Sequence, residues 1–213
     1  MVRTQRGVKS PLVLGWATIG LALAAVACDG ALGRGGTPEP PASALESEAF
    51  LTPVAEAREQ GVTPHWLGDR FEAGGLSFDA SGVARVYEDG LAPSLHVQYD
   101  GRSADALGGV SVDSHPPGGS SARTRLERFS SQTGASPESA RVGPFDAEVA
   151  VSPTGDQPAE NLLLLVHVGD ANVVVQTTRV LGGPEGDIRN LNPLIDKELL
   201  IQVVAENLQP IPE

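Results

Sequence analysis

Along most of the chain after His65, apolar and polar side chains alternate with a period of two. The alternation is clearest in residues 95–99, 110–113 and 145–151. Successive side chains of a strand point to opposite faces of its sheet, so each segment is expected to be a strand with one buried and one solvated face. This arrangement is typical of antiparallel sheets.

Two hairpins are predicted from turn residues between apolar segments. Residues 76–79 and 83–87 flank Ala80-Ser81-Gly82, and residues 160–168 and 172–180 flank Gly169-Asp170-Ala171. The second hairpin is the most apolar part of the chain. Because its first strand is apolar on both sides, we expect that strand to be central and covered on both faces.

Helices are expected before and after the strands. Ser43 to Glu46 has the spacing of a capping box, Thr52-Pro53 combines a cap with Pro at the first helical position, and Gly61 supplies a stop. These signals predict one or two short helices between about 44 and 60. A C-terminal helix is predicted to begin at Asn192-Pro193. Its apolar stripe consists of Ile195, Leu199, Val203 and Val204, with Leu200 and Leu208 at the edges.

The remaining segments separate these elements. Residues 114–122 and 130–139 are rich in turn formers and are expected to be loops. Residues 123–129 fit either a turn of helix or an edge strand. The whole pattern predicts an α+β fold: an antiparallel sheet of about six to eight strands, with short N-terminal helices and a C-terminal helix packed on it. A single domain over residues 43–213 is expected, because this length suits one hydrophobic core.

The N-terminal segment has a different pattern. Its first nine residues contain Arg3, Arg6 and Lys9 and no acidic residue, and an apolar run follows over residues 11–27. A basic head, an apolar middle and a small-residue exit predict a secretory signal peptide over residues 1–27. An uncleaved membrane helix is the alternative, but the run is shorter than the ~20 residues that span a bilayer.

The exit of this signal ends in Ala25-Val26-Ala27-Cys28, and Cys28 is the only cysteine of the chain. The segment resembles the lipobox of bacterial lipoproteins, although the family more often has Leu at the position of Ala25. The resemblance implies that signal peptidase recognises Ala25, Val26 and Ala27. It also implies that Cys28 becomes the acylated N-terminus, carrying diacylglycerol and palmitate, on the outer, extracytoplasmic face of the cell membrane. Two acyl chains hold a protein stably at a membrane. An ordinary signal peptide with an incidental cysteine is the other alternative.

Charge and composition narrow the possible partners. Residues 28–42 are rich in Gly and Pro and are expected to form a flexible tether. Cleavage would leave 15 − 3 = 12 basic and 27 acidic residues, a net charge of −15. Nucleic acid and anionic lipid surfaces both require clustered Lys and Arg, so neither is an expected partner.

The sequence predicts no catalytic residue, no metal ligand and no cofactor. His65, His96, His115 and His167 occur singly, without a second ligand at zinc-like spacing. By the strand alternation His96 is expected to face solvent, whereas His167 is expected in the core or at its rim. Ser111 lies in an alternating segment that lacks the second glycine of a nucleophile elbow.

The acidic residues are expected to form a solvated surface and not a metal site. Asp79, Glu88 and Asp89 are expected near one hairpin, but they lack the spacing of a calcium loop. A solvated acidic surface is the favoured interpretation.

One segment is distinctive. Trp66-Leu67-Gly68, followed by Phe71, resembles a Trp-Leu-Gly-x-x-Phe segment of poorly characterised bacterial extracytoplasmic lipoproteins. In those proteins too, antiparallel strands and a C-terminal helix follow. The resemblance spans residues 63–208 and implies no activity and no site residues. On physical grounds Trp66 and Phe71 are expected to be core anchors where the helical lead-in meets the sheet.

The expected function is therefore a non-enzymatic binding or interaction module of the cell envelope, attached through Cys28 and contacting an envelope protein with its loops. One alternative is a carrier that holds a small apolar ligand, such as a lipid, between sheet and helix. The apolar strand over residues 162–168 suggests it. A hydrolase with a dispersed site is the third reading, and it requires a His with an acid or Ser within hydrogen-bond reach.

Overall fold

A computed structural model describes residues 43–88, 91–102, 107–118, 120–152, 162–178 and 195–213. Pro41–Glu213 form one compact unit. Its fold is α+β, with an eight-stranded antiparallel sheet, N-terminal helices and a C-terminal helix, so the predicted fold class is confirmed. The signal peptide, Cys28 and the tether lie outside the described residues. No helix in the described part of the chain is long and apolar enough to cross a membrane.

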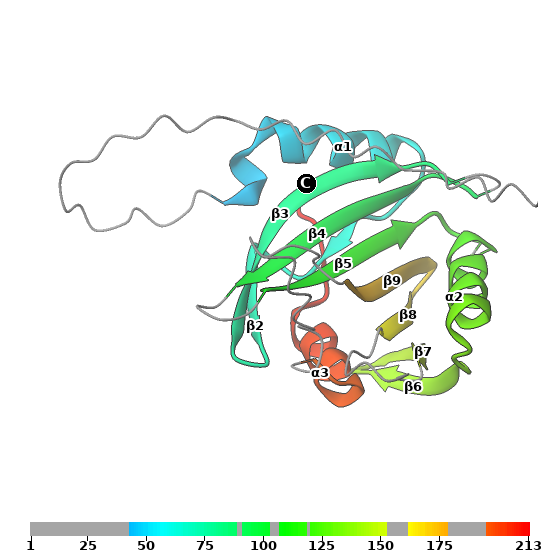
Figure 1. Ribbon diagram of the computed structural model, residues 1–213. Coiled ribbons are helices and arrows are strands. Elements are labelled where there is room, and N and C mark those ends of the chain that lie inside the picture. The colour runs from blue at the N-terminus through cyan, green and yellow to red at the C-terminus, as the bar shows by residue number, and fades with distance from the viewer. Residues whose placement is uncertain (1–42, 89–90, 103–106, 119, 153–161, 179–194) are drawn as a thin grey trace, which may run out of the picture. The chain divides into compact units, whose positions relative to one another are not determined.

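The helices are η1 (Ala44–Glu46), α1 (Glu48–Glu59), α2 (Ser120–Thr133) and α3 (Lys197–Asn207). The strands are β1 (His65–Trp66), β2 (Arg70–Ala73), β3 (Leu76–Val86), β4 (Ser94–Arg102), β5 (Leu107–His115), β6 (Glu138–Val142), β7 (Phe145–Val151), β8 (Leu162–Val168), β9 (Ala171–Thr178) and β10 (Gln209–Pro210). The large sheet has the order β2-β3-β4-β5-β9-β8-β7-β6 (Figure 1). Strand β1 pairs with β10 in a separate two-stranded sheet.

Two hydrophobic cores lie on opposite faces of the large sheet. The larger one contains Phe50 and Val54 of α1, Leu200 and Val203 of α3, and Leu164 of β8. The smaller one joins Leu126 and Phe129 of α2 to Leu163, Leu165 and Val174 of the sheet. Residues 162–166 of β8 are all buried, because alternate side chains enter the two cores. This confirms the prediction of a central strand that is covered on both faces.

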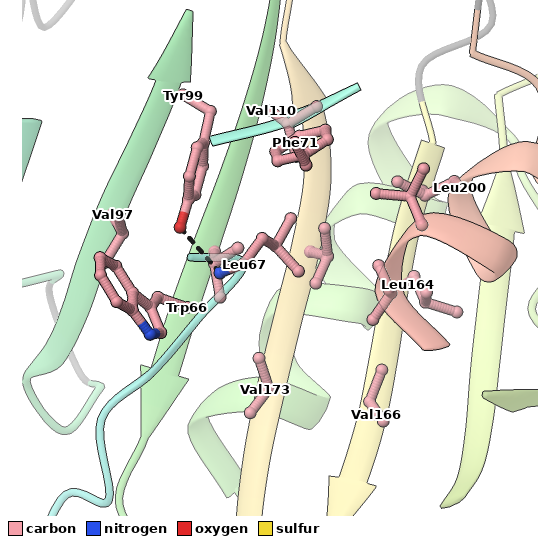
Figure 2. Close-up of a cluster of buried hydrophobic side chains, with 14 of the residues drawn as sticks. Trp66, Leu67, Phe71, Val97, Tyr99, Val110, Leu164, Val166, Val173 and Leu200 are labelled. Carbon is pink, nitrogen blue, oxygen red and sulfur yellow. Dashed lines mark hydrogen bonds between the residues drawn. The ribbon is translucent and has the colours of Figure 1, made fainter. Parts of the chain in front are cut away.

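The Trp-Leu-Gly segment enters the larger core as predicted. Trp66 and Phe71 are both buried, and the Trp66 ring lies 5.7 Å from that of Phe50. The hydroxyl of buried Tyr99 accepts a hydrogen bond from the backbone nitrogen of Leu67 at 2.8 Å (Figure 2). It also donates one to the carbonyl of Gly68 at 3.1 Å. Because burial raises the pKa of this phenol, it stays protonated and keeps both bonds.

The predicted turn at Ala80-Ser81-Gly82 is wrong. Residues 76–86 form one strand, in which Ala80 pairs with Tyr99 and Gly82 with Gln98, so that Ser81 is an extra residue in a bulge. The hairpin turn lies earlier, between β2 and β3, at Gly74 and Gly75. Their φ values of 57° and 77° fall in the left-handed region that such a tight turn requires.

The predicted helix starts also require correction. Helix α1 begins at Glu48, and Pro53 lies inside it rather than at its first position. Gly61 follows the end of α1 with φ of 77°, as expected for a stop. Helix α3 begins at Lys197 with Asp196 as its cap, through a 2.8 Å bond from the nitrogen of Leu199. Asn192 and Pro193 lie outside the described residues.

Two further segments differ from the expected pattern. Residues 123–129 belong to helix α2, which extends through 133 and takes in part of the predicted loop at 130–139. Ser114 and His115, expected in a loop, are the last residues of β5. Helix α2 forms because its apolar side chains Leu126 and Phe129 are buried in the smaller core.

Gly101 allows a close contact within the larger core. It pairs with Phe78 across β3 and β4, and a carbon added at Gly101 would lie 2.5 Å from Cε1 of that ring. Phe78 is fully buried and stacks on Phe71 at 4.9 Å, so the ring has little freedom to move away.

We therefore predict that Gly101→Ala lowers the free energy of unfolding by about 1–3 kcal/mol through overpacking. Urea denaturation followed by fluorescence measures the change. The matched control is Gly82→Ala, because nothing lies within 4 Å of the added carbon there. Equal effects of the two substitutions would show that the Phe78 contact is unimportant.

Candidate functional site

Charged and histidine side chains of β4 and β5 gather beside α2, which packs on the neighbouring strands β7, β8 and β9. His96 and Asp113 are paired residues of these strands and share the face opposite Val97 and Val112. Arg125 of α2 reaches Asp113 from above. We call the whole group the Asp113 cluster; it consists of Glu88, His96, Asp113, His115, Arg125 and Arg128.

Asp113 is the centre of this cluster and its side chain is completely buried. Its Oδ1 lies 2.9 Å from Nδ1 of His96 and 3.1 Å from Nη1 of Arg125. Burial alone would raise the pKa of Asp113, but the hydrogen bond from His96 and the charge of Arg125 hold the pKa below its usual range. The carboxylate therefore stays ionised inside the fold.

The charges continue from Asp113 toward the surface. Arg125 also lies 3.8 Å from Oε1 of Glu88, and Oε2 of Glu88 is 3.2 Å from Nη1 of Arg128. Glu88 follows the end of β3, so these pairs join the β3–β4 connection to α2. The hydroxyl of Ser121, which accepts a hydrogen bond from the nitrogen of Ala92 at 2.9 Å, adds to the same junction.

His115 lies beside Asp113 on the same face of β5 and is 2% exposed. Burial lowers its pKa to about 4, aided by the positive charge of Arg125 and opposed by the negative charge of Asp113. Neither ring nitrogen has a hydrogen-bond partner among the residues that the structure describes, and Oδ2 of Asp113 has none either. His115 is therefore a neutral, buried imidazole at neutral pH.

A second group of polar side chains lies on the other flank of α2. Arg123 binds both carboxylate oxygens of Glu148 in β7, one of them at 2.7 Å. This bond lowers the pKa of Glu148. Nδ1 of His167 lies 2.8 Å from the side-chain oxygen of Asn172. Ion pairs thus hold α2 to the sheet on both sides of its apolar stripe.

The pair formed by His96 and Asp113 resembles two members of a catalytic triad, in which a carboxylate orients an imidazole. Catalysis of that kind also needs a nucleophile hydrogen-bonded to the imidazole. No Ser, Thr or Tyr hydroxyl bonds to His96 within the described ranges. Within the same ranges, no three His, Cys, Asp or Glu side chains are placed to hold a metal ion. The geometry that is present fits attachment of α2 to the sheet.

Several predicted placements change. His96 does not face open solvent: its side chain is 26% exposed and is bound to Asp113. His167 is at the rim of the fold, as expected, with a side chain that is 40% exposed. Asp79 and Glu88 do not meet: Asp79 lies in the first half of β3 and pairs with Arg70, whereas Glu88 follows the end of β3 and pairs with Arg125 and Arg128. Asp89 lies outside the described residues, as do Ala25, Val26, Ala27 and Cys28.

The chain has no significant match among protein-family models, curated proteins or solved structures. The chemistry of its own residues is therefore the basis for a functional proposal.

The buried His115 predicts a pH dependence of stability. Between pH 6.5 and about 4, the unfolded chain binds a proton at this residue and the folded chain does not. The free energy of unfolding must therefore fall as the pH falls through this window. The full difference between these two pKa values corresponds to roughly 3 kcal/mol.

We predict that His115→Leu makes the free energy of unfolding less dependent on pH between 6.5 and 4, as measured by urea denaturation at several pH values. His65, whose pKa is also lowered by burial, is present in both proteins and leaves a residual slope. Asp113 titrates below its usual range and so contributes little in this window. Identical slopes for the two proteins would contradict a neutral buried His115.

Proposed function

We propose that the protein is a lipid-anchored, non-enzymatic binding module, held at the outer face of the cell membrane by acyl chains on Cys28. The basic, apolar and small-residue segments before Cys28 support the anchor. The Gly- and Pro-rich residues 28–42 support a tether that gives the folded domain reach.

One observation supports a binding role and indicates the class of partner: the basic side chains whose contacts the structure gives are already engaged within the fold. Arg123, Arg125, Arg128, Arg70 and Lys197 pair with carboxylates. Arg58 and Arg141 bind backbone carbonyl oxygens, and Arg85 binds the side chain of Gln60. These cationic groups are thus paired within the fold, several of them at its surface.

Many carboxylates, in contrast, remain available. Glu48, Glu56 and Glu59 of α1 are exposed and have no cationic partner among the described residues. Their spacing puts them on one side of the helix, opposite the buried Phe50, Val54 and Ala57. We call this surface the acidic face of α1. A surface of this kind suits a cationic partner, and we infer a segment of an envelope protein that is rich in Lys and Arg.

The anchor is tested by metabolic labelling. Cells that express the protein are expected to incorporate labelled palmitate into it, and Cys28→Ala is expected to abolish the label and release the protein from the membrane fraction. Absence of label from the unmodified protein would remove the anchor from the proposal.

The binding role is tested with immobilised poly-lysine as the cationic probe. We predict binding that weakens as salt is added, because exposed charges are screened. Changing Glu48, Glu56 and Glu59 together to Gln should weaken binding roughly tenfold, since each exposed pair contributes about 0.2–1 kcal/mol. The matched control neutralises three other exposed acids, Glu72, Glu127 and Asp170.

Two results would count against this function. Equal binding to poly-glutamate, or no binding to poly-lysine at low salt, would contradict an acidic binding surface. A native mass spectrum with a co-purified lipid would instead support the alternative of an apolar-ligand carrier.

A further inference from the structure

One edge of the large sheet is only partly occupied. The outermost strand, β2, pairs with residues 76–79 of β3 and then ends. The following residues, Gly82–Val86, pair with β4 on one side only. We call this stretch the open edge of β3.

The hydrogen-bond alternation identifies which residues of the open edge point outward. The nitrogen of Ala80 donates to Asp69 at 2.9 Å, so Ala80 faces the β2 side and Asp79 faces Asp100 of β4. The bulge then adds one residue and reverses the alternation. Gly82, Ala84 and Val86 therefore face β4, opposite Gln98, His96 and Ser94. The backbone groups of Val83 and Arg85 point away from the sheet.

These outward groups are free to bind. In the part of the chain that the structure describes, the backbone nitrogen and oxygen of Val83 and Arg85 have no partner beyond the sheet. The side chains along this edge are largely apolar, and Tyr87 beyond it is 68% exposed. An edge with unpaired backbone groups and few charges is a template for another strand.

The opposite edge of the sheet is formed by β6. Unlike the open edge of β3, it has the proline and charged residues with which natural sheets prevent pairing with another strand. Pro137 and Pro144 flank it, and it carries Glu138 and Arg141. Lys197 of α3 pairs with Glu138 at 3.2 Å. The open edge of β3 has no Pro and a single charged residue, Arg85, whose guanidinium is bound to Gln60 and lies 5.9 Å from the Tyr87 ring centroid. Only one of the two edges is therefore protected.

Charge indicates the occupant of the open edge. Helix α1 packs against β3 (Figure 1), and the bond from Arg85 to Gln60 brings the end of α1 to this edge. Glu56 and Glu59, just before Gln60, belong to the acidic face of α1. A second copy of the chain would bring the same acids and a mature net charge of −15, which opposes pairing between copies. A cationic strand meets attraction instead.

We propose that an extended segment of a partner protein, with Lys or Arg alternating with apolar residues, binds the open edge of β3 as an additional antiparallel strand. Backbone hydrogen bonds to Val83 and Arg85 supply affinity, and the negative charge carried by the neighbouring α1 favours a cationic sequence through long-range attraction. This inference rests on the proposed binding function and names the surface and the partner's conformation.

The test follows amide hydrogen exchange by NMR in the purified full chain. The probe is a six-residue peptide of alternating Lys and Val, and the control probe has Glu in place of Lys. The amides of Val83 and Arg85 are expected to exchange rapidly without peptide and at least roughly tenfold more slowly with saturating Lys-Val peptide. The Glu-Val peptide is expected to have no effect.

Variants locate the contact. Val83→Pro removes an outward N–H and is tolerated at an edge, so it should abolish binding of the Lys-Val peptide. Ala84→Lys, at an exposed position of the same edge, preserves the backbone and repels the peptide, which keeps the test decisive if the proline variant does not fold. Ser139→Lys on β6 is the matched control and should bind the peptide as the unmodified protein does.

Three outcomes would overturn the inference. They are unchanged exchange at Val83 and Arg85 with the Lys-Val peptide, equal protection by both peptides, and protection that rises with protein concentration when no peptide is present. The last result would assign the edge to a second copy. If poly-lysine binds but these two amides do not respond, the edge proposal fails and the acidic binding function stands. If poly-lysine does not bind, the function itself fails.

Discussion

The burial of β8 on both of its faces is the constraint on which the rest of the structure depends. Leu162 and Leu164 point to one face, and Leu163 and Leu165 point to the other. Each face must be covered by another apolar element, because a solvated row of Leu side chains would lose several kcal/mol of burial energy, about 1.5–3 kcal/mol for each side chain. Helices α1 and α3 cover one face, and α2 covers the other. The layered architecture follows from this strand.

The second face is covered by a helix with a narrow apolar stripe. Leu126 and Phe129 of α2 join Leu163, Leu165 and Val174 in the smaller core, whereas the neighbouring Arg125 pairs with Asp113 of β5. A partly buried arginine requires a nearby opposite charge, and Asp113 supplies one. The cost of burying that carboxylate is offset by His96 and Arg125 together. The Asp113 cluster thus lies where the smaller hydrophobic core ends.

The sequence predicts those parts of the fold that are determined by residues close together in the chain. The hairpin of β8 and β9 was predictable because an apolar run, Gly169 and a second apolar run follow one another directly. The bulge at Ser81 was not, because Ala80-Ser81-Gly82 has the composition of a turn and only pairing with β4 keeps the strand continuous. Arg125 and Asp113 could not be related from sequence, since twelve positions separate them along the chain and the contact arises from the docking of α2. The sequence did contain one sign of the Asp113 cluster: polar residues occupy every second position from 111 to 115, and so share one face of a strand.

The strand order also has a consequence for how the sheet assembles. Strands β2 to β5 are consecutive neighbours, as are β6 to β9, so each half is a meander built from pairings that are local in the chain. A single seam, β5 against β9, joins the halves and brings residue 115 next to residue 172. Closing this seam joins segments that are far apart in the chain, and non-local pairing of that kind is slow. Until the seam closes, β5 and β9 each expose an unpaired edge, so the sheet passes through a stage at which its middle, rather than its rim, is open to misassembly.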